Sequence, residues 1–73
     1  MQKIKVPIRT EYIKMDSLLK FAGVADTGGM AKEIIEQGEI TLDGETVVQR
    51  GKKVRPGMTV QVGLDVLIEV TSA

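Results

Sequence analysis

The sequence predicts an α+β fold in which two short helices pack on a small, mainly antiparallel sheet. Apolar residues recur at helical spacing between about residues 15 and 37, and they alternate with polar residues before and after that region. Asp-Gly and Pro-Gly pairs separate the alternating segments, as turns do. With 73 residues, the chain is expected to form one domain, 1–73, with a small core.

The first expected element is a strand over residues 3–8. Ile4, Val6 and Ile8 fall on one side of it and polar residues on the other. Pro7 has no N–H group to donate to a neighbouring strand, so this segment is expected at the edge of the sheet.

A short helix is expected next. Met15, Leu18, Leu19 and Ala22 have the spacing i, i+3, i+4 and i+7, which places them on one helical face. Gly23 is a plausible end for this helix, and Phe21 is expected on its buried side.

A second helix is expected after Asp26 or Thr27, because either side chain can cap it. Gly38 is expected to end it. Neither helix can bury its apolar face alone, so the two should pack together. The apolar face of the second helix consists of Met30, Ala31, Ile34 and Ile35.

The remaining segments are expected to be strands joined by turns. Residues 40–42 and 45–47 flank Asp43-Gly44, a strong hairpin signal. Pro56-Gly57 is expected to turn the chain into a strand at 59–62, and another strand at 66–70 follows. Met15, Met30 and Met58 are expected to fill the core. The other expected core residues are Leu18, Leu19, Ala22, Ala31, Ile34, Ile35, Ile40, Leu42, Val60 and Val62.

Charge is balanced overall but segregated along the chain. Ten basic residues match ten acidic residues, so the net charge is zero. Residues 26–45 contain six acids and one lysine, whereas residues 46–55 contain four cations and no acid. Such segregation is able to produce one basic face on a neutral protein.

Four segments, in their order and spacing, resemble the S-four RNA-binding domain, which is named after a small-subunit ribosomal protein. The resemblance extends from about Ile13 to Val62. It implies that the two helices and the adjoining loop bind structured RNA, often ribosomal RNA. Small bacterial single-domain members carry Gly-Gly-Met-Ala-Lys at the second helix, as this chain does. The four segments are residues 15–20, 27–38, 40–45 and 54–60.

Two parts of the sequence are candidates for phosphate binding. At Thr27-Gly28-Gly29, free N–H groups of a helix start would bind an anion, with Lys32 one turn away; the other interpretation is that the glycines only ease a tight turn. The cations at 50–55 either bind phosphates or form a solvated loop. The residues predicted to bind RNA are Lys14, Lys20, Thr27, Gly28, Gly29, Lys32, Arg50, Lys52, Lys53 and Arg55. The cations from Lys20 onward and the N–H groups near Gly28 and Gly29 are expected to form one surface.

Tyr12 and Phe21 are the two aromatic residues. Proteins that bind single-stranded RNA use aromatic side chains to stack bases. The scarcity of aromatic residues therefore favours recognition of the shape and phosphates of a folded RNA.

Catalysis is not expected, because the chain lacks His and Cys, the commonest general base and the strongest nucleophile. No metal or cofactor is expected. The expected partners are structured RNA, ribosomal RNA above all, and a ribosomal subunit, with a role in ribosome assembly or a ribosome-associated process. The protein is expected to be a cytoplasmic monomer without a membrane segment. The alternative is a protein-interaction module whose acidic helix face contacts a basic partner such as a ribosomal protein.

Overall fold

The structure is a computed structural model that describes residues 2–73. It has two helices and seven strands, and the predicted α+β class is confirmed. No helix in this part of the chain is long and apolar enough to cross a membrane. The elements in chain order are β1 (Gln2–Ile8), β2 (Ile13–Lys14), α1 (Met15–Phe21), α2 (Gly28–Glu36), β3 (Ile40–Leu42), β4 (Glu45–Thr46), β5 (Lys53–Val54), β6 (Thr59–Val62) and β7 (Val66–Ser72).

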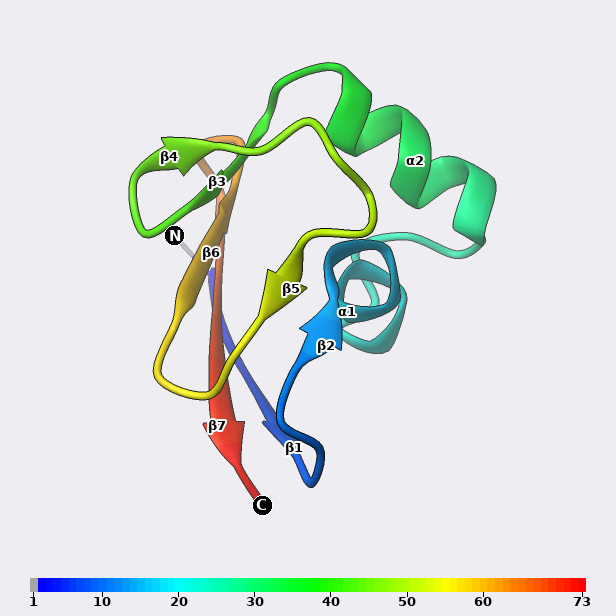
Figure 1. Ribbon diagram of the computed structural model, residues 1–73. Helices are drawn as coiled ribbons and strands as arrows, with labels where there is room; N and C mark the ends of the chain where they lie inside the picture. The colour runs from blue at the N-terminus through cyan, green and yellow to red at the C-terminus, as the bar shows by residue number, and fades with distance from the viewer. Residues whose placement is uncertain (1) are drawn as a thin grey trace.

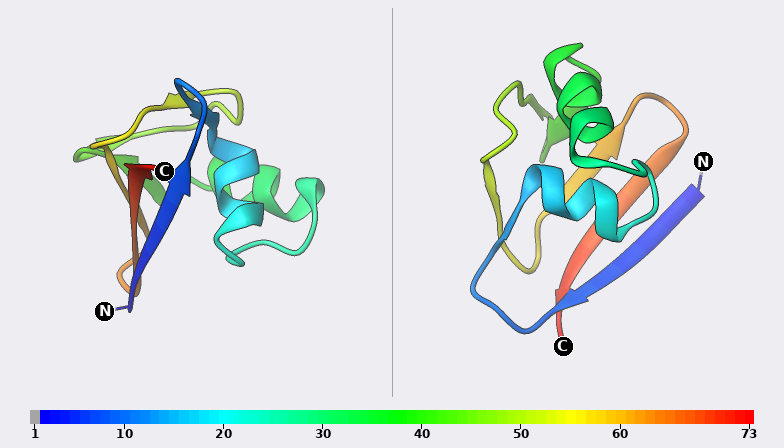
Figure 2. Two further views of the ribbon diagram at one scale, coloured as in Figure 1. Left: turned by 90° about the horizontal axis from the view of Figure 1, so that it is seen from below. Right: turned by 90° about the vertical axis from the view of Figure 1, so that its right-hand side faces the viewer.

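Five of the strands form one mixed sheet in the order β1-β7-β6-β3-β4. Its β1–β7 pair is parallel, and its other three pairs are antiparallel, so the sheet is mainly antiparallel as predicted. Both helices lie on the same side of this sheet (Figure 1, Figure 2). The short strands β2 and β5 pair with each other and form a separate two-stranded sheet.

One hydrophobic core lies between the helices and the sheet. Of the ten aliphatic residues predicted for it, Ala22, Ile34 and Val62 are partly buried against the core, and the other seven are buried. Strands β1, β5 and β7 and the segment after β4 add further buried side chains, so every layer contributes. These additional residues include Val6, Ile8, Val47, Val54, Ile68 and Val70.

Two predictions of burial are wrong. Phe21 is 68% exposed and Met30 is 44% exposed. Phe21 lies about 200° around the helix from the buried Leu19, because successive residues are about 100° apart. It therefore lies on the side of α1 turned away from Leu19. Met30 is in the first turn of α2, where its Sδ accepts a hydrogen bond from the backbone N–H of Asp26 at 3.5 Å.

The predicted ends of both helices agree with the backbone. Gly23 and Gly38 follow α1 and α2 with φ of 79° and 78°, the left-handed conformation that favours glycine after a helix. At the start of α2, Thr27 Oγ1 accepts a hydrogen bond from the N–H of Met30 at 3.1 Å. Thr27 is therefore the cap that the sequence predicts as one of two possibilities.

The β3–β4 hairpin turns at Asp43 and Gly44, where the sequence predicts it. Both residues have positive φ, 49° and 91°, as the two central positions of a type I′ turn require. Asp43 Oδ1 also accepts a hydrogen bond from the N–H of Thr59 at 3.0 Å, which ties the turn to β6.

Replacing Gly44 with alanine is expected to lower the free energy of unfolding by about 1–2 kcal/mol, because a Cβ atom is strained at positive φ. Gly51→Ala is the matched control. A Cβ atom meets no atom within 4 Å at either position, but Gly51 does not have positive φ. Urea unfolding followed by circular dichroism measures the difference. Equal stability of the two variants would contradict the conformational explanation.

The outer edge of the sheet at β1 has few hydrogen-bond donors. Gln2 N–H donates to the carbonyl of Asp65, and the Ile8 carbonyl accepts from Ala73 N–H. Alternate residues of a parallel strand bond to the same neighbour, so the even-numbered residues face β7. The donors left free at this edge are the N–H groups of Lys3 and Lys5, because Pro7 has no N–H group. Lysine and proline at an edge oppose pairing with another chain, and the predicted edge position is confirmed.

Candidate nucleic-acid interface

The backbone of the basic segment, residues 50–55, is attached to the start of α1. Met15 N–H donates to the carbonyl of Lys52 at 2.9 Å, and Asp16 N–H donates to the carbonyl of Arg50 at 3.1 Å. The N-cap residue of α1, Lys14, makes no side-chain hydrogen bond to the helix. The segment thus satisfies two N–H groups that a helix start leaves without partners. Its backbone is fixed, while its cationic side chains are exposed.

Part of the basic segment is a strand and not the loop that the sequence suggests. Lys53 and Val54 form β5, which pairs with β2 so that Lys53 lies opposite Lys14 and Val54 opposite Ile13. Val54 is fully buried and anchors the strand in the core. This pairing brings together two cations that are 39 positions apart in the sequence.

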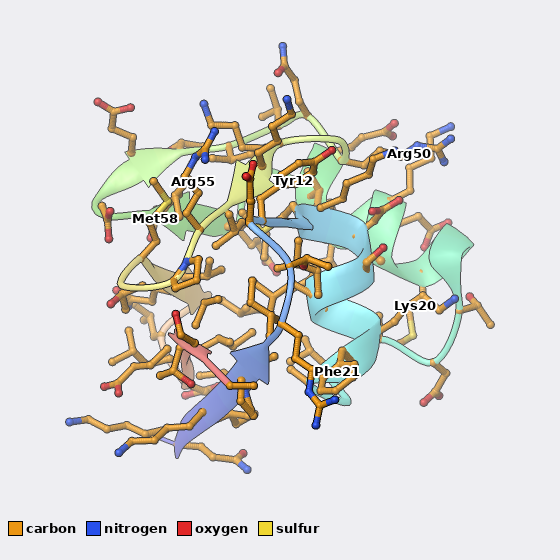
Figure 3. The ribbon with its side chains drawn as sticks, turned by 60° about the horizontal axis from the view of Figure 1, so that its bottom comes forward. Tyr12, Lys20, Phe21, Arg50, Arg55 and Met58 are labelled. Atoms are coloured by element: carbon orange, nitrogen blue, oxygen red, sulfur yellow. The ribbon has the colours of Figure 1, made fainter. Side chains whose placement is uncertain are left out.

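The Lys14–Lys53 pair is electrostatically unfavourable, because like charges directly opposite each other destabilise a strand pair. Lys53 Nζ also lies 4.9 Å from the centre of the Tyr12 ring, at the distance of a cation–π interaction. In Figure 3, Tyr12 lies between Arg50 and Arg55. Tyr12 and Lys53 thus place an aromatic ring and an exposed cation together beside the Lys14–Lys53 pair.

The start of α2 is the second candidate site. The first N–H groups of a helix have no partner within the helix. Of these groups, the N–H of Met30 donates to the Thr27 side chain. Neither Gly28 nor Gly29 has positive φ. A Cβ atom would meet nothing within 4 Å at Gly28, and at Gly29 its closest neighbour would be Thr27 Oγ1 at 3.9 Å. Packing and backbone conformation therefore do not explain the two glycines.

The remaining predicted cations lie on the helices. Lys20 is exposed in the last turn of α1, next to the exposed Phe21, and Figure 3 shows both far from Arg50 along the helix. Lys32 Nζ lies 3.8 Å from Glu36 Oε1, and both side chains are more than half exposed. An exposed pair of this kind contributes little to stability, so Lys32 is easily released to another anion.

The predicted site residues thus lie at the start of α1, at the start and along the exposed side of α2 and, for Lys20, in the last turn of α1. That they form one surface stays a prediction. Lys14, Lys53 and the backbone of 50–52 meet at the start of α1. Gly28 and Gly29 begin α2. No hydrogen bond or ion pair within residues 2–73 joins the residues at these two helix starts.

Tyr12 belongs to this surface, although the sequence predicts no binding role for it. Phe21, predicted to be buried, is exposed in the last turn of α1. Tyr12 lies two residues before Lys14, immediately before β2, and in an extended chain this spacing places two side chains on the same side. That spacing was the available signal. Lys53 lies over the Tyr12 ring, so the surface at the start of α1 offers one stacking group as well as phosphate ligands.

Comparison with known proteins gives two matches. A family model described as "S4 domain" matches residues 6–71, nearly the whole chain. A Bacillus subtilis (strain 168) protein named "Probable ribosome maturation protein RlbA" is 35% identical over 57 residues, which are 78% of this chain and 80% of that protein.

Proposed function

This chain belongs to the S4 domain family, and from that premise we propose that it binds structured RNA without catalysing a reaction. Its target is ribosomal RNA, and its role lies in ribosome assembly or another ribosome-associated process. The similarity to a protein named for ribosome maturation supports the ribosomal role. Membership of the smaller group marked by Gly-Gly-Met-Ala-Lys remains a prediction from the sequence.

The Lys14–Lys53 pair is the observation that supports this function best. Two lysines held side by side repel each other until an anion lies between them. RNA phosphates supply such anions at regular spacing along a surface, and neutralising them releases counterions, which favours binding. Three more exposed cations lie close to this pair in the sequence and would extend the contact with RNA: Arg50, Lys52 and Arg55. The absence of His and Cys from the sequence fits a module that does not catalyse.

We expect the protein to act as a cytoplasmic monomer without a cofactor. The donor-poor edge of β1 supports the monomer, because it opposes the pairing of two sheets through that edge.

Fractionation of cell extract on sucrose gradients tests the ribosomal role. At low salt the protein is expected to travel with a ribosomal subunit, the large one on the precedent of the family. At high salt it is expected to leave the subunit, because phosphate contacts weaken as salt rises. If the protein stays at the top of the gradient at both salt concentrations, the ribosomal role is wrong.

A pulldown with and without ribonuclease distinguishes RNA binding from the alternative protein partner. Digestion is expected to release the ribosomal material from the protein. Ribosomal proteins that remain bound after digestion would instead support contact through the acidic helix face.

A further inference from the structure

A hollow of about 650 Å³ lies between the β3–β4 hairpin and the basic segment. Its volume is within the range of small-molecule sites. Leu42 and Met58 give it an apolar part, and Lys52, Lys53 and Arg55 give it a cationic wall. The hairpin adds two carboxylates, Asp43 and Glu45. The RNA-binding role proposed above uses the cations and leaves the carboxylates unexplained.

The opposite charges that line the hollow do not pair. Within residues 2–73, one ion pair has a nitrogen–oxygen distance of 4.0 Å or less. It is the pair of Lys32 and Glu36 on α2. The carboxylates of Asp43 and Glu45 are therefore more than 4.0 Å from the nitrogen atoms of the cationic wall. The unpaired charges leave room for a group with hydrogen-bond donors at one end and an anion at the other.

The two carboxylates differ in their freedom to bind a ligand. Asp43 Oδ1 already accepts the hydrogen bond from Thr59 N–H, at 3.0 Å. In the described part of the chain, the Glu45 carboxylate accepts no hydrogen bond. Glu45 thus presents two acceptor oxygens, and an ionised carboxylate is able to accept two parallel hydrogen bonds.

On the basis of the proposed function, we propose that this hollow binds one unpaired guanine nucleotide of the RNA. The guanine N1–H and N2–H₂ groups donate to the two oxygens of Glu45. The base lies against Leu42 and Met58, and its phosphate lies towards the cationic wall of Lys52, Lys53 and Arg55. RNA-binding proteins commonly read unpaired bases through hydrogen bonds to the Watson–Crick edge.

Guanine is the base whose Watson–Crick edge fits a carboxylate. Its N1–H and N2–H₂ are adjacent donors, which match the two oxygens. Uracil has one N–H between two carbonyl oxygens, and these would face the carboxylate oxygens. Cytosine and adenine have one amino group beside a ring nitrogen that accepts, so each gives the carboxylate a single hydrogen bond.

Titration of the ¹⁵N-labelled full chain with single nucleotides, followed by NMR, tests the proposal. Guanosine 5′-monophosphate is expected to bind about tenfold more tightly than the adenosine, cytidine and uridine monophosphates, and to shift the amide signals of residues 42–45 and 52–55. Inosine 5′-monophosphate, which lacks only the N2 amino group, is expected to bind more weakly than guanosine monophosphate by a similar factor.

Glu45→Gln is expected to abolish the preference for guanosine monophosphate, because an amide presents one acceptor and one donor. Glu39→Gln is the matched control, since it removes the same charge from an exposed glutamate outside the hollow. It is expected to keep the preference. Equal binding of all five nucleotides to the unmodified protein would overturn the proposal. So would a uniform gain in affinity for all five with Glu45→Gln, because that would be a charge effect alone.

Binding of deproteinised ribosomal RNA to the unmodified protein separates this proposal from the RNA-binding role. If ribosomal RNA binds with the expected salt dependence but guanine is not preferred, the guanine site is wrong and the RNA-binding role stands. If ribosomal RNA does not bind, the RNA-binding role fails, whatever the nucleotides do.

Discussion

Replacing both Lys52 and Lys53 with glutamate is expected to raise the Kd for ribosomal RNA by at least about a hundredfold. Each lost phosphate contact removes a hydrogen bond between charged groups, worth roughly 1.5–3 kcal/mol, and about 1.4 kcal/mol corresponds to a factor of ten. The slope of log K against log salt is expected to fall by about one for each contact. Filter binding or fluorescence anisotropy at several salt concentrations measures both quantities.

Lys3→Glu combined with Lys5→Glu is the matched control for this experiment. It changes the net charge by the same amount but places the new acids on β1, at the far edge of the five-stranded sheet from β4. These lysines are exposed and are not among the predicted site residues. A comparable loss of affinity in the control would show that net charge, and not the basic segment, governs binding.

Truncating Leu19 to alanine is expected to lower the free energy of unfolding by about 2–5 kcal/mol. Leu19 is fully buried in the core, so the change removes packed atoms and leaves a cavity beneath α1. A domain of this size has a total stability of roughly 4–11 kcal/mol, at about 0.05–0.15 kcal/mol per residue. The variant is therefore expected to lose a large part of its stability, as measured by urea unfolding.

Leu64→Ala makes the same chemical change at a site that is 84% exposed. It is expected to alter the free energy of unfolding by no more than about 0.5 kcal/mol, because the removed atoms already contact solvent. Similar unfolding curves for the two leucine variants would mean that the core is assigned wrongly.

Features of the fold that depend on nearby residues could be predicted from the sequence. The Asp43-Gly44 turn and the glycines after both helices need positive φ, and these residue types are typical of that conformation. The β1–β7 and β2–β5 pairs could not be predicted. They join segments far apart in the chain, and β2 and β5 have two residues each, too few for a pattern of alternation.

The candidate site also has features that the sequence predicts and features that depend on the fold. A run of four cations in six positions is visible in the sequence, and so is the capped start of α2. The Lys14–Lys53 pair is not visible, because it depends on the pairing of β2 with β5. The placement of Glu45 opposite the cations depends on how the hairpin packs beside the basic segment. The sequence predicts a buried Phe21 because a hydrophobic residue near an apolar helical face is usually buried, but the side chain is exposed.

The parallel β1–β7 pair imposes an order on folding during synthesis. Gln2 pairs with Val66 and Ile8 with Ser72, so within residues 2–73 the first strand to be synthesised, β1, has its one sheet neighbour in the last strand, β7. The helices and the β3–β4 hairpin, by contrast, depend on short loops that close early. Val6 and Ile8 therefore stay uncovered by their neighbouring strand until residues 66–72 emerge, and the nascent domain completes its core only at that point.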